Sequence, residues 1–386
     1  MVKHSSRIEL SQSAVTRNLN FIRRKIGPGP IISSVVKANA FGHGIAQFVP
    51  MAERAGIWHF AVASCAEAEQ VLQARTRPDT HVMIMGILYD EDLPWVIENE
   101  VEFYVFDCER LEAARKAARA CGVKAKVHLE VETGCNRTGI DEDNFERAIK
   151  HLREHPDAFV FKGICTHLGG AESLSNKFKI DQQMVRFRAY RSKLKKKGYL
   201  PEYFHISSSA ASLSMPEARM DMVRVGIAQY GYWPSQDIYQ IHLQETGKRS
   251  DNPLTRVIRW STDVMHLKTV PKGEFVGYGT AFQATQDIDI AVLPLGYANG
   301  YPRELSNKGH VLIRGKKAPV VGVINMNLFM VNVNHIPQVQ LGDEAVMIGK
   351  QRGNSITVGA FANYTNQLNN EMLSSLPESI PRYVVR

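Results

Sequence analysis

Eight short apolar runs rich in β-branched residues recur between residues 31 and 227, each separated from the next by a segment with helical periodicity. The spacing leaves room for one helix between consecutive runs. Alternating strands and helices in this number predict a closed parallel (β/α)₈ barrel rather than an open sheet. The predicted strands are Ile31–Val36, His59–Ala63, His81–Met85, Glu102–Phe106, Lys126–Val131, Phe159–Cys165, Tyr203–Ile206 and Met222–Ile227.

The pattern changes after about residue 240, where helical spacing gives way to strand-like runs separated by Gly, Pro and Asp. A chain of 386 residues is too long for one ordinary core. We therefore predict an α/β barrel domain over residues 1–240 and a mostly-β domain over residues 241–386. The polar segment Pro234–Thr255 is the expected linker. The chain is expected to begin with a helix, over Thr16–Lys25, packed outside the barrel.

Composition narrows the partners that the chain can have. The formal net charge of +8 owes much to Phe178–Lys197, where apolar residues keep helical spacing and the cations fall on the other face. No nucleic-acid motif accompanies these cations, so a solvated helix face is expected. No apolar stretch is long enough to cross a bilayer, the start lacks the apolar core of a secretory signal, and the five scattered cysteines suggest neither disulfides nor zinc. We expect a cytoplasmic protein without a metal, nucleic-acid or membrane partner.

A lysine stands directly after the first predicted strand, in the segment Val35–Gly44. The carboxyl ends of barrel strands form the face that carries active sites. Partial desolvation there lowers the pKa of an ammonium group and favours Schiff-base formation with an aldehyde. Position alone fits equally well a Lys37 side chain that extends into solvent.

Other polar residues follow later strands in the same way, and this places them on one rim with Lys37. They are Arg137, His167, Ser209, Gly226 and Ile227, after strands five, six, seven and eight. The loops after strands seven and eight of such barrels commonly bind phosphate through backbone N–H groups and hydroxyls.

The segment Val-Val-Lys-Ala-Asn-Ala-Phe-Gly-His-Gly, residues 35–44, closely resembles the pyridoxal-phosphate (PLP) lysine motif of alanine racemases. Further similar segments follow in order through almost the whole chain. They include 132–139, Thr166-His167, His205 with 209–211, 224–231, 277–279, 296–303 and 381–383. The resemblance implies a PLP-bearing barrel, a C-terminal β domain, and a head-to-tail homodimer whose active sites combine both subunits.

The resemblance also implies a role for each matched residue. Racemisation removes a proton from one face of Cα and delivers one to the other, so two opposed bases are the simplest arrangement. Lys37 and Tyr278 match these bases. The implied contacts are His167, Ser209, Arg224, Gly226, Ile227 and Tyr383 with the cofactor, Arg137, Met326 and Asn327 with the amino-acid substrate, and Glu130 and Tyr297 in support.

Arg224 bears on the type of reaction. A guanidinium stays protonated, so a pyridine nitrogen hydrogen-bonded to it has no reason to take up a proton. The ring is then a poorer electron sink, which favours reprotonation at Cα over transamination.

Glu130 stands where many family members have a modified, negatively charged lysine that orients the arginine equivalent to Arg137. We expect its carboxylate to do the same without modification.

Three departures from the family pattern leave the substrate open. Phe41 replaces a tyrosine whose hydroxyl reaches the phosphate, and Asn299 and Asn327 replace aspartates near the entrance. Loss of charge there alters the field around the substrate side chain, so a racemase for serine or larger amino acids is an alternative to alanine.

Two further readings remain. One keeps the barrel but changes the reaction to decarboxylation, elimination or aldol cleavage. Arg224 argues against decarboxylases, and metal-assisted relatives need ligands that the widely spaced His266, His310 and His335 do not supply. The other is a PLP-carrier protein, which would be a single barrel without Tyr278.

Overall fold

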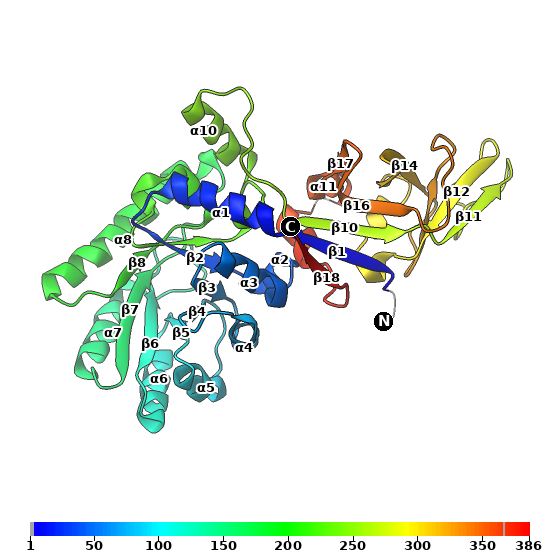
Figure 1. Cartoon of the computed structure of the whole chain (residues 1–386). Helices are drawn as coiled ribbons and strands as arrows, with labels where there is room; N and C mark the ends of the chain where they lie inside the picture. The colour runs from blue at the N-terminus through cyan, green and yellow to red at the C-terminus, as the bar shows by residue number, and fades with distance from the viewer. Residues whose placement is uncertain (1–3, 366) are drawn as a thin grey trace. The chain divides into compact units, whose positions relative to one another are not determined.

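The computed structural model describes residues 4–365 and 367–386, in two compact units (Figure 1). The barrel unit holds residues 13–38 and 48–255, and the β unit holds the described residues up to 12 together with 39–47 and 256–386.

Eight parallel strands form the barrel, hydrogen-bonded in the order β8-β7-β6-β5-β4-β3-β2-β9. The ring closes between β8 and β9 through the Ser207–Val223 bridge, with Arg224 N donating to Ser207 O at 3.0 Å. The predicted (β/α)₈ fold is confirmed, and every predicted strand lies within two residues of an observed one. The strands are β2 Ile31–Val35, β3 His59–Val62, β4 His81–Ile84, β5 Glu102–Val105, β6 Ala125–Glu130, β7 Phe159–Cys165, β8 Tyr203–His205 and β9 Met222–Val225.

Helices connect successive strands and surround the barrel (Figure 1). They begin where the sequence offers capping groups: the side chain of Ser64 accepts from Glu67 N before α4, and Asp107 accepts from Arg110 N before α6. Helix α8 buries one apolar stripe and leaves most of its cations exposed, as the helical spacing predicts. The helices of this part are α1 Gln12–Ile26, α3 Ile45–Arg54, α4 Cys65–Ala74, α5 Leu93–Glu98, α6 Cys108–Cys121, α7 Glu142–Glu154, α8 Lys177–Lys197, α9 Ser209–Ser214 and α10 Gln236–Thr246.

The β unit is built on a ten-stranded sheet, ordered β11-β12-β15-β14-β13-β16-β10-β1-β18, with β17 paired to β16. Trp260 on β10 is fully buried in it. Its strands are β1 Ser6–Ser11, β10 Ile258–Asp263, β11 His266–Val270, β12 Ile288–Leu293, β13 His310–Ile313, β14 Lys316–Val321, β15 Phe329–Asn332, β16 Glu344–Gln351, β17 Asn354–Ile356 and β18 Arg382–Val385. Helices α11 Val358–Thr365 and α12 Asn369–Ser374 complete the unit.

Two predictions are wrong in detail. The first described element is not a helix but β1, which pairs with β10 and β18, so these residues belong to the β sheet although the predicted boundary places them with the barrel. Pro234–Thr255 is not only a linker, because it contains α10, whose first turn is capped by Ser235 accepting from Ile238 N. Among the described residues, no helix combines the length and hydropathy needed to cross a membrane.

Candidate active site

The carboxyl ends of the barrel strands carry the polar residues that the sequence placed there. Lys37 follows β2, Arg137 lies in the loop after β6, and His167 follows β7. Ser209 opens α9 after β8, and Gly226 and Ile227 follow β9. Because the strands are parallel, their carboxyl ends share one mouth of the barrel. Arg137 and Arg224 are close enough there to lower the pKa of Lys37 and that of His167.

Three side chains, those of Gln229, Tyr230 and Glu67, fix the backbone around Lys37. The carbonyl of Val35 accepts from Gln229 Nε2 at 2.9 Å and from the Tyr230 hydroxyl at 3.0 Å. Glu67 accepts from the backbone N–H of Ala38 at 2.6 Å with one oxygen and from that of Ala63 at 2.8 Å with the other. The ends of β2 and β3 are thereby tied together beside the lysine.

The amine of Lys37 sits in surroundings that favour its neutral form. Burial at the barrel mouth lowers its pKa, the nearby cations Arg137 and Arg224 lower it further, and Glu67 opposes them. The Lys37 residue as a whole nevertheless remains exposed to solvent. A neutral, accessible amine is the form that attacks an aldehyde.

The residues after Lys37 form a left-handed turn. Ala38, Asn39, Ala40 and Phe41 have φ between 50° and 54°, a conformation that costs L-residues roughly 1–2 kcal/mol each. Within the β unit, Asn39 accepts from Gly44 N with its carbonyl and from Ile45 N with its side chain, both at 2.8 Å. Local strain of this kind persists where surrounding contacts over-determine it, and it is common at functional sites.

Arg224 is nearly buried and has four hydrogen-bond acceptors in the barrel. Its guanidinium donates to His205 Nδ1 at 2.8 Å, to His205 O at 3.0 Å, to Thr166 O at 2.9 Å and to Ile206 O at 3.4 Å. This set fixes the orientation of a permanently charged group.

His167 is neutral at ordinary pH. Burial, followed by the cations Arg224, Arg137 and Lys37, lowers its pKa to about 3.

Glu130 ends β6 and lies beside the loop that carries Arg137. Its Oε1 is 4.0 Å from a guanidinium nitrogen of Arg137, and its Oε2 accepts from the Thr138 hydroxyl at 2.7 Å. The loop turns at Gly139, which has φ +124°, and a Cβ there would lie 2.7 Å from the backbone nitrogen of Glu132. A glycine is needed at this close approach.

The loops after β8 and β9 present donors that suit a phosphate group. Gly226 N donates to Ser209 Oγ at 2.8 Å. The hydroxyl of the neighbouring Ser208 is buried and has no hydrogen-bond partner among the described residues. A buried hydroxyl without a partner costs free energy, which a ligand oxygen would recover.

The remaining predicted site residues belong to the β unit. Tyr278 is 73% exposed and stands between Gly277 and Gly279, both with positive φ. Tyr297 and Met326 are half-exposed and adjacent, since Tyr297 N donates to Asn325 O and Ala298 N to Met326 O. Asn327 is exposed, and Tyr383 is half-exposed on β18.

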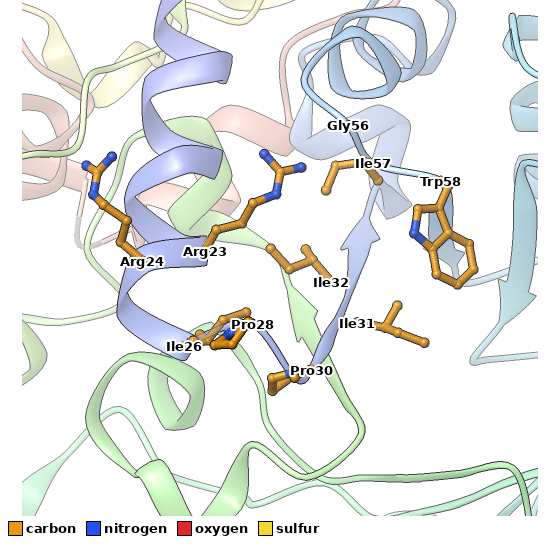
Figure 2. Close-up of a pocket in the computed structure, with 12 residues that line it drawn as sticks. Arg23, Arg24, Ile26, Pro28, Pro30, Ile31, Ile32, Gly56, Ile57 and Trp58 are labelled. Carbon is orange, nitrogen blue, oxygen red and sulfur yellow. The ribbon is translucent and has the colours of Figure 1, made fainter.

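A separate cleft of about 600 Å³ lies at the opposite end of β2 from Lys37. Arg23, Arg24, Pro30 and Trp58 line it (Figure 2). The amino-terminal face of such barrels generally contributes stability rather than catalysis, so this cleft is no part of the Lys37 site.

Sequence reasoning missed several residues that build the site. The Ser64-x-x-Glu67 spacing indicates a helix start, but not that Glu67 also holds Ala38. Ser208, Gln229, Glu102 and His128 carry no sequence signal of their own, although Glu102 and His128 are buried inside the barrel.

Both parts of the chain resemble known proteins. Residues 10–234 match the family model for the alanine racemase N-terminal domain, and residues 257–384 match that for its C-terminal domain. The alanine racemase of Methanococcus maripaludis is 32% identical over 384 residues, covering 99% of both chains.

Solved structures show the same likeness. The alanine racemase of Streptomyces coelicolor is 30% identical with a TM-score of 0.89, covering 99% of this chain and 98% of that one. The alanine racemase of Bacillus anthracis with bound L-Ala-P is 28% identical with a TM-score of 0.90, covering 100% and 96%. Together with the lysine at the end of the first barrel strand, these matches show that the chain belongs to the alanine racemase family.

Proposed function

We propose that this chain is a PLP-dependent racemase that interconverts L- and D-alanine with Lys37 and Tyr278 as opposed bases. The observation that carries the proposal is the amine of Lys37, whose pKa is lowered at a barrel mouth that it shares with Arg137, His167 and Arg224. Family membership supplies the substrate, since the relatives compared above are named alanine racemases.

The residues at the mouth fit PLP group by group. Lys37 suits the aldehyde, Arg224 the pyridine nitrogen, and the hydroxyls of Ser208 and Ser209 with the backbone at Gly226 and Ile227 the phosphate. When bound, the cofactor supplies the electron-withdrawing ring that makes the Cα–H of an amino acid acidic.

The chain's own residues position the substrate and move the proton. Arg137 binds the carboxylate of the amino acid, with Glu130 beside it to orient the guanidinium. Nζ of Lys37 holds or delivers the proton on one face of Cα, and the hydroxyl of Tyr278 does so on the other. Neutral His167 provides a hydrogen bond near the ring, and Tyr383 reaches the phosphate. Met326 and Asn327 contact the substrate, and Tyr297 supports the site.

The active enzyme is proposed to be a cytoplasmic homodimer in which Tyr278 of one subunit serves the barrel of the other. A broader specificity is the second candidate, because Asn299 and the exposed Asn327 are neutral where the family has carboxylates. Serine or larger side chains then meet less restriction at the entrance.

A D-amino-acid oxidase assay on a panel of L-amino acids tests both candidates. We expect D-alanine as the main product. A higher kcat/KM for serine would favour the second candidate, whereas no D-amino acid from any substrate, with amine or CO₂ release instead, would overturn racemisation.

A further inference from the structure

A network of hydrogen-bonded, buried polar side chains runs inside the barrel to Arg224. Barrel interiors are filled mostly by branched apolar residues, but Glu102, His128 and His205 are each 0% exposed here. His128 Nε2 lies 2.7 Å from Glu102 Oε2, His128 Nδ1 lies 2.9 Å from His205 Nε2, and His205 Nδ1 lies 2.8 Å from Arg224. Such groups stabilise a core only when every member is satisfied.

The direction of every hydrogen bond in this network follows from Arg224. A guanidinium has no acceptor, so it must donate to Nδ1 of His205. His205 then carries its proton on Nε2 and donates to Nδ1 of His128. His128 in turn carries its proton on Nε2 and donates to Glu102. Both rings are thus neutral, in agreement with burial lowering the pKa of His128 and, more strongly, of His205.

The backbone around His128 is shaped to admit its ring. The register of β6 against β7 shifts between Val127 and His128, which brings His128 opposite Gly163. A Cβ on Gly163 would lie 2.2 Å from His128 Nδ1, so no other residue leaves room for the imidazole. A β-bulge and a glycine at one position indicate a placed side chain rather than a chance contact.

Glu102 is the last member of this hydrogen-bond network and accepts as a charged carboxylate. Burial opposes its ionisation, but hydrogen bonds from His128, His59 and His81 hold the pKa of Glu102 well below its usual value. His59 lies 3.4 Å and His81 3.2 Å from the carboxylate, and the ammonium of Lys162 lies 3.7 Å from it. A carboxylate here polarises all the hydrogen bonds of the network in one direction.

We propose that Glu102 is a positioning residue which, through His128 and His205, holds the guanidinium of Arg224 against the pyridine nitrogen of the cofactor and so suppresses transamination. The proposal rests on the proposed function, because it assigns that nitrogen to Arg224. The polarised Nδ1 of His205 is the only side-chain acceptor among the four that Arg224 uses. Weakening it loosens the guanidinium and lets the ring act as a stronger electron sink.

The hydrogen-bond direction can be tested on the protein without any assay of turnover. Long-range ¹H–¹⁵N correlation spectra of ¹⁵N-histidine-labelled protein distinguish the two ring nitrogens, and His128→Gln and His205→Asn variants assign the signals. We expect both rings as neutral Nε2–H tautomers. A cationic ring, or an Nδ1–H tautomer at either position, overturns the proposal whatever reaction the enzyme catalyses.

The effect on the reaction is measured as pyridoxamine phosphate formed per racemisation event in the holoenzyme. This ratio does not depend on how much of a variant folds, because both products come from the same active molecules. Glu102→Gln keeps the shape and removes the charge, while Gly163→Ala displaces the His128 ring without removing any polar group. We expect each to raise the ratio about three- to tenfold, within the range of coupling in one hydrogen-bond network.

A double variant and a matched control complete the test. If both changes act through the same hydrogen-bond network, the double variant Glu102→Gln with Gly163→Ala raises the ratio no more than either change alone. Glu53→Gln is the control. Glu53 is also a buried carboxylate, but it accepts hydrogen bonds from Thr76 and Thr80 and is not part of this network. An unchanged ratio in Glu102→Gln, or a product of the two effects in the double variant, overturns the proposal. Absence of D-alanine in the unmodified enzyme overturns the proposed function instead.

Discussion

At the scale of single residues, the mouth of the barrel controls the protonation of Lys37. Burial and the two nearby arginines lower the pKa of its amine, so more of it is neutral than in an exposed lysine. We expect borohydride to fix the cofactor covalently to Lys37, as peptide mapping can show. Lys37→Ala should lower racemisation by more than the roughly 10²–10⁴-fold typical of one lost base, because it also removes the anchor. Label on another lysine would contradict the assignment.

Glu130 and Arg137 provide a second residue-scale prediction. The two side chains lie 4.0 Å apart, and the Thr138 hydroxyl binds the other carboxylate oxygen. Glu130→Gln keeps the Thr138 contact and removes the charge that orients the guanidinium. We expect a raised KM, with kcat changed less, in steady-state kinetics. A lower melting temperature with unchanged KM would show that the pair serves stability alone.

How far the site could be predicted depends on where its residues lie. The rim residues could be found because parallel strands bring their carboxyl ends together, and this follows from strand positions alone. Ser208 and Gln229 could not, because their roles depend on burial and on a partner far along the chain. The left-handed turn at Ala38–Phe41 could not either, since among these residues only Asn favours that conformation.

At the scale of elements, too, the sequence predicts what depends on local patterns and misses what depends on partners far along the chain. Each barrel strand carries its own apolar run, so all eight could be predicted locally. The first strand, β1, gives no sign that its partners are β10 and β18, more than two hundred residues away. The sequence of α10 predicts a linker because polar residues dominate this short helix, which buries only Ile238 and His242.

The loop after β6 gives a prediction at this scale. Gly139→Ala would force a Cβ to within 2.7 Å of the backbone of Glu132, so the loop must shift and move Arg137. We expect a raised KM for the amino acid together with a lower melting temperature. Gly122→Ala is the matched control, because Gly122 also has positive φ but has nothing within 4 Å of the new Cβ. It should cost about 1 kcal/mol of stability and leave KM unchanged. Equal KM values in both variants would refute the role of this turn.

At the scale of the whole molecule, three histidines of the barrel set its response to acid. His128, His167 and His205 all have pKa values lowered chiefly by burial, to about 3 for His167. The unfolded chain takes up protons on these rings below about pH 6.5, whereas the folded barrel does not. Its stability should therefore fall as pH drops from about 6.5, by up to about 1.4 kcal/mol per pH unit for each histidine.

Urea unfolding between pH 8 and pH 5 measures this dependence. The midpoint should stay level above pH 7 and fall below pH 6.5, before most carboxylates titrate. His167→Asn removes one of the groups and should flatten the slope. A midpoint that is constant down to pH 5 would mean that the three rings are protonated in the folded barrel.

The last prediction concerns how two chains share one site. Lys37 belongs to the barrel unit and Tyr278 to the β unit, where its side chain is 73% exposed. If the tyrosine of one subunit serves the lysine of the other, Lys37→Ala and Tyr278→Phe homodimers each lack one of two opposed bases at every site and should be nearly inactive.

In a mixed dimer of these two variants, both changes fall in the same site, and the second site keeps an unmodified lysine and tyrosine. Unfolding the variants together and refolding them with PLP should therefore restore activity. Random re-pairing in a two-site dimer gives up to about a quarter of the unmodified level. The unmodified enzyme, carried through the same refolding, is the control. If it recovers while the mixture stays as inactive as its parents, Tyr278 acts within its own chain or takes no part in the reaction, because only a shared site can be rebuilt from two incomplete subunits.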